Sequence, residues 1–488
     1  MRKKIDGASM GSKIIILELN EVPFSVIDDY AGRHPKSNWA RVVKAGARFD
    51  TFNPDIGRLH PKTSWQTFHR GVENTVHKII EYNQSDDEIN QKYPNFWQIA
   101  RDSGKSIGCG ASIGSYPVPS TLENVAFYLP DPFSPAYDTY PPYLESFQSL
   151  NNVAVAKSGR VVRKGLPIGA VASFMLNLPR MGISLKTLSK VARQLISERK
   201  DRKRIVRRRT IQGLMTFDVC LKQIRGSSPD MSTIFSNHVA SSMHRYWAAS
   251  FPDDYEENNM PLWWQEQYSG EIEYAMDEAD YMLGELLKYS KQNPEYRIVC
   301  LGTMGQAGVA HKVAKNQTII KDFEKFLKVL GFDPGTYQRK GGMEPLYVIE
   351  FPDEADCGRF VETMSSVKIN ERAPTTVSRL NENQVRFSIG QTNVPEEISV
   401  SVGNRTYQSV DAGIKVEAIQ DLASSTAQHV PEGACLVFSG TEDLSSYSGN
   451  KMVPLMSVTS SLLDGIGCEV PDYMPEPDLN MVAAIQLK

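Results

Sequence analysis

Histidines and hydroxyl residues gather in one stretch of the chain. Residues 54–79, PDIGRLHPKTSWQTFHRGVENTVHKI, include three of the eight histidines, His60, His69 and His77. A helix is predicted from Thr63, and a hydroxyl at its start would lie against the helix N-terminus, which favours a bound phosphate or sulfate. Plain N-capping by Thr63 or Ser64 is the competing explanation. The stretch therefore predicts either a nucleophile-bearing helix or an ordinary capped one.

Polar side chains also follow the predicted strands. The β-branched run Ile14–Leu17 predicts a buried parallel strand, and it continues into Glu18 and Asn20. Ligands of α/β proteins bind at the carboxyl ends of such strands. Glu18 and Asn20 are therefore candidate catalytic residues, although ordinary loop positions remain open for them.

Two later strands end in further candidates. Ser232–Phe235 is followed by Asn237, His238 and, six residues on, His244. This spacing does not place both histidines on one helix face, but they could still converge near the strand end. Arg297–Leu301 runs into GTMGQAG, where Thr303 begins a loop whose amides could hold an anion, or which is simply a tight connection.

Composition restricts the class of protein. The 488 residues are 41% apolar and 23% charged, with a net charge of −3, which is ordinary for a globular chain and gives no general case for nucleic acid. The six cysteines are isolated, which favours a reducing compartment. No signal-peptide pattern and no apolar run of about 18 residues is found, so a cytoplasmic protein is expected.

Helix and strand patterns alternate through most of the chain. This predicts a doubly wound α/β fold, a mostly parallel sheet with helices on both faces. The expected core is made of residues 12–150, 231–342 and 428–488. Residues 151–230 are expected to form a helical basic insert, and residues 343–427 a small β-rich insert.

The helical insert is strongly basic. Between residues 157 and 209 there are sixteen Lys or Arg and only two acids. Such a segment could be a solvated helical cap, or could lie on an anionic membrane surface, which would make the protein peripheral to the inner membrane face. Nucleic acid is the weaker alternative, because no aromatic residues alternate with the charges.

Several motifs together resemble the alkaline phosphatase superfamily, most nearly its type I phosphodiesterase/nucleotide pyrophosphatase branch. SWQTFHRG with the following VHKI is similar to the segment after the nucleophile, and MHRYW to a metal-binding segment. HVPEGACLVFSG resembles the late segment that contains a metal-binding histidine, His429 here, and PLMSVTSSLLDGIGCEVPDYM resembles the tail helix. The resemblance implies two divalent metals, usually zinc, and a Thr or Ser that attacks phosphorus.

The matching positions depart from that pattern. His244 and His429 match metal-binding histidines, but Ala240 stands where an Asp is expected, and Thr303-Met304-Gly305 replaces the Asp-His-Gly motif of the second metal. The nucleophile position falls on Pro61, so Thr63 serves only if the helix start is shifted, and His60 is the other candidate.

A rearranged site is therefore expected. Either it keeps one ion, most simply zinc, with His238, His244 and His429 as its ligands, or these histidines do acid–base work directly. The candidate catalytic residues are His60, Thr63, Glu18, Asn20 and His69, and the candidate ligand-binding residues are Asn237 and Thr303. The expected activity is that of a phosphoric or sulfuric ester hydrolase or phosphoryl transferase. Its partner would be a phosphorylated or sulfated small molecule or glycan, such as a nucleotide sugar, since similar proteins accompany surface-polysaccharide machinery. The alternative is an inactive module that binds a ligand, a membrane or a partner.

Overall fold

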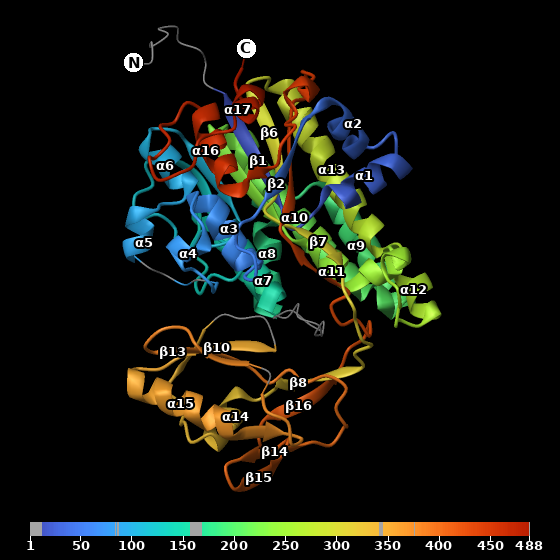
Figure 1. The fold of residues 1–488 in the computed structure, drawn as a ribbon, viewed down its shortest axis with the longest axis vertical. Helices are drawn as coiled ribbons and strands as arrows, with labels where there is room; N and C mark the ends of the chain where they lie inside the picture. Colours follow the sequence, from blue (N-terminus) through green and yellow to red (C-terminus); the bar gives the residue numbers. More distant parts are fainter. Residues whose placement is uncertain are drawn as a thin grey trace.

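An eight-stranded sheet forms the centre of the computed structural model (Figure 1), which describes residues 12–82, 84, 87–156, 168–340, 345–374 and 376–487. The strands lie in the order β19 (Val453–Pro454), β2 (Ala47–Phe52), β18 (Glu432–Phe438), β6 (Tyr296–Gly302), β1 (Lys13–Leu19), β5 (Met231–Ser236), β3 (Ile107–Gly110) and β4 (Val125–Leu129). All neighbours are parallel except β18, which runs antiparallel to both β2 and β6.

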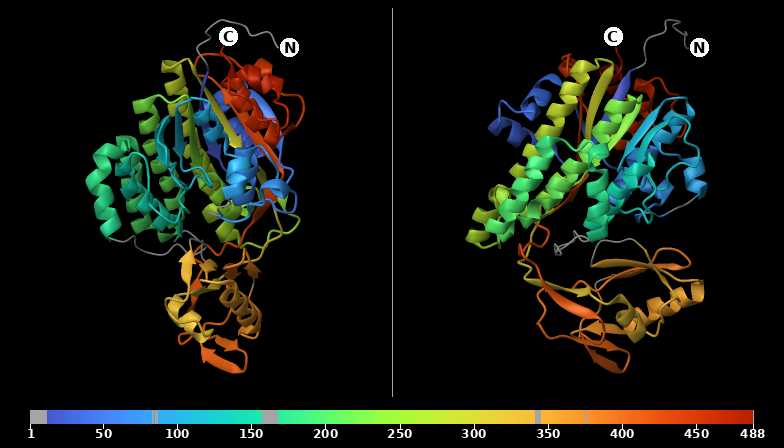
Figure 2. Two further views of the ribbon diagram at one scale, coloured as in Figure 1. Left: turned by 90° about the vertical axis from the view of Figure 1, so that its left-hand side faces the viewer. Right: turned by 180° about the vertical axis from the view of Figure 1, so that it is seen from behind.

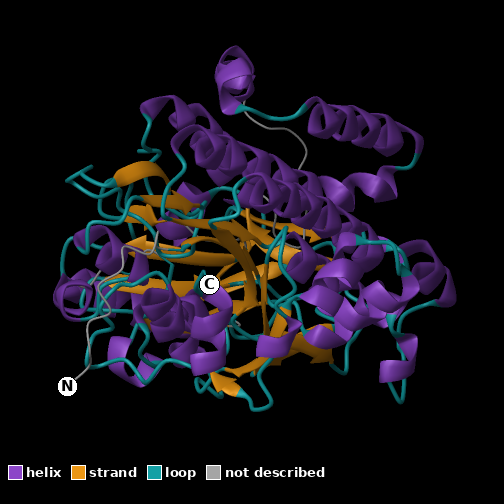
Figure 3. Cartoon of the chain, turned by 90° about the horizontal axis from the view of Figure 1, so that it is seen from above, coloured by secondary structure: helices purple, strands orange, loops and turns teal. Residues whose placement is uncertain are grey.

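The middle strands are apolar because both faces of the sheet are covered. Ile14, Ile15, Ile16 and Leu17 of β1 are each 0% exposed. Helices lie on both faces of the sheet (Figure 3), which is the reason a parallel strand reads as one continuous apolar run. The register of β1 with β5 ends at Leu19 beside Ser236, so that Asn20 and Asn237 leave the sheet at the same edge.

The helices of the core connect these strands in order. They are α1 (Phe24–Arg33), α2 (Asn38–Ala45), α3 (Pro61–Arg70), α4 (Asn74–His77), α5 (Asp87–Lys92), α6 (Phe96–Asp102), α7 (Glu145–Ala156), α8 (Ile168–Met181), α9 (Leu185–Lys200), α10 (Arg208–Ser227), α11 (His238–Ser250), α12 (Leu262–Tyr268), α13 (Glu271–Gln292), α16 (Leu455–Gly465) and α17 (Leu479–Ile485). None of the described helices is long and apolar enough to cross a membrane.

A smaller β-rich unit has its own hydrophobic core and lies beyond the end of the sheet (Figure 2). Two ribbons lead to it: β7 (Gly305–Gly308) with β17 (Ala427–Val430), and β8 (Asn316–Ile320) with β16 (Ile414–Ala418). It contains β9 (Gln338–Lys340), β10 (Leu346–Glu350), β11 (Val367–Ile369), β12 (Thr376–Arg379), β13 (Gln384–Ser388), β14 (Ser399–Val402), β15 (Arg405–Gln408), α14 (Phe323–Val329) and α15 (Glu354–Ser366).

The expected fold class, a mostly parallel sheet with helices on both faces, is confirmed. The second hydrophobic core extends from Ile320 to Ile414, so the β-rich unit begins before the expected residue 343. The edge strand β4 ends at Leu129, directly before Pro130. In the basic insert, α10 packs against β5 as part of the core, and residues 157–167 lie outside the described residues.

Candidate metal and ester-binding site

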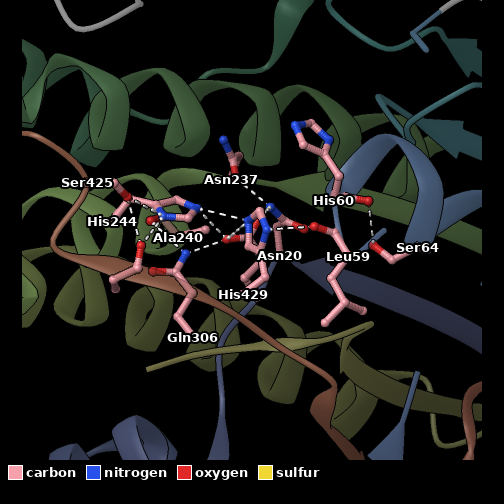
Figure 4. A network of polar contacts seen from close by, with 12 residues as sticks. Asn20, Leu59, His60, Ser64, Asn237, Ala240, His244, Gln306, Ser425 and His429 are labelled. Carbon is pink, nitrogen blue, oxygen red and sulfur yellow. Dashed lines mark hydrogen bonds and ion pairs between the residues drawn. The ribbon is translucent and has the colours of Figure 1, made fainter. Parts of the chain in front are cut away.

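A carboxylate and two imidazoles converge at the carboxyl edge of the sheet. Glu21 follows β1, His244 is on the second turn of α11, and His429 is on β17. Figure 4 shows the two imidazoles, of His244 and His429, side by side. Glu21 Oε2 lies 2.8 Å from His244 Nε2 and 3.4 Å from His429 Nε2. The two Nε2 atoms are 3.2 Å apart. We call these three residues the Glu21 cluster.

The reversed direction of β18 brings His429 to this edge. Parallel strands present only their carboxyl ends here, and Glu21 and α11 follow such ends. Because β18 is antiparallel to β6, the segment that enters it lies at the same edge as the exits of its neighbours. His429 is therefore close to Glu21 despite its distance along the sequence.

Hydrogen bonds on the far side of each imidazole fix its tautomer. His429 Nδ1 is 2.8 Å from the Leu59 carbonyl oxygen, and His244 Nδ1 is 3.2 Å from that of Ala427. A carbonyl only accepts, so each Nδ1 carries a proton, and in the neutral rings both Nε2 lone pairs face Glu21. These two lone pairs and the carboxylate oxygen are held together either by protons on Nε2 or by a metal cation that binds all three atoms.

The donor set fits a divalent metal, and zinc best. Zinc in proteins takes imidazole and carboxylate ligands at about 2.0–2.2 Å in a tetrahedron, which sets neighbouring donor atoms about 3.3 Å apart. The three distances within the Glu21 cluster, 2.8, 3.2 and 3.4 Å, scatter around that value. Three protein ligands leave one position open, as in catalytic zinc sites.

Neighbouring side chains hold the carboxylate of Glu21 in place. Asn20 Nδ2 donates to Glu21 Oε1 at 2.7 Å, and Gln306 Nε2 donates to Glu21 Oε2. Trp65 Nε1 in turn donates to Asn20 Oδ1 at 2.7 Å. Burial alone would raise the pKa of the Glu21 carboxyl, but the positive charges that His244 and His429 can take hold that pKa well below its usual value. Glu21 is thus a buried anion prepared for a cation.

The Glu21 cluster forms one wall of a cavity of about 280 Å³. Asn237 and His60 line the same cavity, and so do Arg209 and Arg245 from α10 and α11. Arg245 also pairs with Asp421 at 3.0 Å. Burial and the nearby Arg245 lower the pKa of Arg209 to about 9, as expected for guanidinium groups that lie close together. Two cations in one cavity favour an anionic ligand.

His60 is the N-cap of α3 and faces this cavity. Its Nδ1 accepts from the Lys62 backbone N–H at 3.3 Å, so the proton of the neutral ring is on Nε2. Burial, followed by the charge of Lys62, lowers the pKa of His60 to about 3. His60 can therefore donate a hydrogen bond to a substrate oxygen as a neutral imidazole.

The lowered pKa of His60 predicts that the folded protein becomes less stable as the pH falls. A histidine whose pKa is lowered on folding binds its proton more readily in the unfolded chain, at about pH 6.5. The free energy of unfolding should therefore fall as pH falls from 6.5 towards 3, and this fall should be shallower in His60→Asn, where Asn can still cap α3. Urea titrations at several pH values measure the slope. An identical slope in both proteins would show that His60 is not the group responsible.

His238 is not part of the cluster, which corrects its prediction as a metal ligand. Its Nδ1 is 2.7 Å from Ser236 Oγ, and its Nε2 is 3.1 Å from the carbonyl oxygen of Ala275 on α13. Both ring nitrogens are thus engaged by protein partners, although His238 is among the residues that line the cavity. The six-residue spacing to His244 leaves the two rings on different sides of α11.

Four other predicted residues also lie elsewhere. Glu18 and His69 form a fully buried pair, with His69 Nε2 3.0 Å from Glu18 Oε1. Thr63 is buried within α3, whose start at Pro61 is not shifted, and it does not line the cavity. Thr303 Oγ1 donates to Ser64 Oγ at 3.0 Å behind α3. These positions do not support catalytic roles for Glu18, Thr63 and His69, or ligand binding by Thr303.

Glu21 is the functional residue that sequence reasoning missed. Glu21 lies three residues after Glu18, and Glu18 was chosen as the candidate because it directly continues the predicted strand. The backbone of Glu21 has φ of +62°, in the left-handed region, so the chain turns sharply after the strand. The only feature of the sequence that could have identified Glu21 is a carboxylate that follows the end of a predicted strand. Ala240, where an Asp ligand of the first metal was expected, and Met304, within the motif expected for the second metal, are buried apolar residues that supply no ligand.

Comparisons with known proteins give a distant likeness of fold. No family model matches the chain, and no curated protein matches it in sequence. Human ectonucleotide pyrophosphatase/phosphodiesterase 5 is 10% identical, with a TM-score of 0.37, over 95% of this chain and 96% of its own. The murine protein, as an inactive variant in complex with AMP, is 11% identical, with a TM-score of 0.40, over 95% and 97%. The case for a function therefore rests on the side chains of the site.

Proposed function

We propose that the protein is a metal-dependent phosphoric ester hydrolase or phosphoryl transferase with a single divalent ion, and that its substrate is a phosphorylated small molecule or glycan. The observation that supports this is the convergence of Glu21, His244 and His429 on one point beside a cavity lined by two arginines. A phosphoryl group needs a cation near the oxygen that leaves or attacks and further cations on its other oxygens.

Each part of the site has a task in this proposal. Glu21, His244 and His429 would hold the ion, which when bound would act as a Lewis acid and lower the pKa of a bound water. Arg209 and Arg245 would bind the remaining anionic oxygens of the substrate from the opposite side. His60 would donate its Nε2–H to a phosphoryl or leaving-group oxygen, and Asn237, whose Oδ1 accepts from Asn20 at 2.7 Å, would position the ester.

The start of α3 favours direct attack over a covalent intermediate. Pro61 lines the cavity at the position where relatives place the attacking hydroxyl, and it has no nucleophilic group. Ser64 is buried, and its hydroxyl donates to the His60 carbonyl oxygen at 3.1 Å. The attacking oxygen should therefore come from water or an acceptor substrate. Lys62 and the N-terminus of α3 would contribute only a positive electrostatic potential, not a nucleophile.

Stereochemistry at phosphorus tests this mechanism. A single in-line displacement inverts a chiral phosphorothioate ester, whereas a two-step reaction through an enzyme-bound ester retains its configuration. We expect zinc-dependent hydrolysis of an aryl phosphodiester by the full chain, with inversion. Retention, or a trapped phosphoryl-enzyme, would disprove direct attack but leave the metal site intact.

An inactive binding module is the second candidate, favoured by Ala240, where an Asp ligand of the first metal is expected, and by Thr303-Met304, which replaces ligands of the second metal. It predicts metal binding without turnover. Phosphomonoesters, phosphodiesters and sulfate esters should be compared with zinc, manganese and magnesium. No hydrolysis or transfer of any of them, with one ion bound, would favour this module over the enzyme.

A further inference from the structure

Helix α9 is amphipathic in the reverse of the usual sense. Its inward face consists of polar residues, Thr187, Gln194 and Glu198, which are at most 8% exposed. Its outward face has Leu185, Leu195 and Ile196, which are 85%, 51% and 54% exposed. Leu188 and Ala192 lie between these leucines at the same helical spacing. Exposed apolar stripes of this kind mark surfaces that something else covers.

A basic groove adjoins this stripe. It has a volume of about 700 Å³, and Arg199, Arg202, Lys203 and Arg208 line it together with Leu195 and Tyr268. Leu195 belongs both to the stripe and to the groove, so the two are one continuous surface. We call the stripe and the groove together the α9 surface.

The cations of the groove are only partly neutralised. Arg208 forms an ion pair with Glu198 at 2.7 Å. Lys203 lies 4.9 Å from the ring centroid of Trp263 on α12, whose own indole is 47% exposed. Within the described ranges, no carboxylate pairs with Arg199 or Arg202. Other arginines of the segment, Arg204 and Arg207, are instead bound to Glu271 and belong to the body of the protein.

From these features we propose that the α9 surface binds an anionic phospholipid bilayer. Leucine and isoleucine side chains would enter the acyl boundary, and the groove would take phosphate headgroups between Arg199, Arg202 and Lys203. Trp263 and Leu262, which is 76% exposed, extend the same surface with residue types suited to the membrane interface. A second copy is a poorer occupant, because two such cationic faces repel each other. This inference does not depend on the proposed reaction.

Vesicle sedimentation of the full chain tests the proposal. Wild type should bind phosphatidylcholine vesicles that contain phosphatidylserine, and binding should weaken at least about tenfold when the serine lipid is omitted or the salt concentration is raised. Arg199→Glu/Arg202→Glu/Lys203→Glu should lose at least about tenfold in affinity, and so should Leu195→Ser/Ile196→Ser. The tryptophan emission of wild type should shift to the blue on binding, and Trp263→Phe should abolish that shift.

Two control variants test whether vesicle binding depends on the α9 surface or only on the net charge and exposed leucines of the whole protein. Lys328→Glu/Lys368→Glu/Arg405→Glu places the same charge change on exposed positions of the β-rich unit, and Leu479→Ser removes an exposed leucine elsewhere. Both controls should bind vesicles as wild type does. Equal binding by the α9-surface variants, or no binding by wild type at low salt, would overturn the proposal. So would a dimer in sedimentation velocity that Leu195→Ser/Ile196→Ser dissociates.

Discussion

Replacing His429 with alanine is expected to abolish metal binding and to lower kcat/KM more than about a hundredfold. The Glu21 cluster has three donor atoms, and removal of one leaves a carboxylate and a single imidazole, too few for a stable zinc site. Even changes to residues that only orient metal ligands typically cost 10–100-fold. Glu21→Gln should behave similarly while keeping the shape of the side chain.

Metal content after dialysis and steady-state kinetics measure this effect. Zinc should also raise the melting temperature of wild type, since an ion present at about 100 times its Kd adds roughly 2.7 kcal/mol to the free energy of unfolding. The variant should show no such rise. His34→Ala is the matched control, because His34 pairs with Glu273 on the surface. This variant should still bind one zinc ion. One equivalent of zinc in His429→Ala would contradict the assignment.

The second large effect concerns stability. His69→Ala should lower the free energy of unfolding by about 3–5 kcal/mol, because it leaves the carboxyl of Glu18 buried without its partner. Both side chains are 0% exposed, and the ring of His69 lies 4.7 Å from that of Trp97 and 5.5 Å from that of Trp65. No solvent can reach the vacated position to hydrate the carboxyl.

Urea denaturation of single and double variants measures this loss in the free energy of unfolding. Glu18→Met/His69→Phe, which replaces the pair by apolar groups, should recover most of the lost stability. The turnover of folded His69→Ala at low temperature should stay within a few-fold of wild type, because His69 does not line the cavity. Normal stability with lost turnover would instead return His69 to a catalytic role.

The sequence was informative where local pattern determines structure. The short apolar runs that form β1, β5 and β6 were predicted as strands from their residue types alone. His244 and His429 were predicted as ligands, and the structure brings them together. Local pattern could not place Glu21, because its left-handed backbone depends on the turn into α1, nor could it exclude His238, whose partner carbonyl is on α13. Side-chain direction at a strand end depends on tertiary contacts that spacing does not encode.

The antiparallel strand β18 has a consequence for how the protein is made. Glu21 and His429 are separated by 408 positions (429 − 21), and β18 must insert between β2 and β6, which are synthesised much earlier. Synthesis of the 130 positions (432 − 302) from the end of β6 to the start of β18 takes about 7–26 seconds at roughly 5–20 residues per second, and that gap in the sheet is open for this time. A ribosome-bound fragment that ends before residue 429 should therefore take up no zinc at this site. If the Glu21 cluster binds a metal as proposed, loading would be one of the last steps in the folding of the nascent chain, after any chaperone that shields the edges of β2 and β6 has acted.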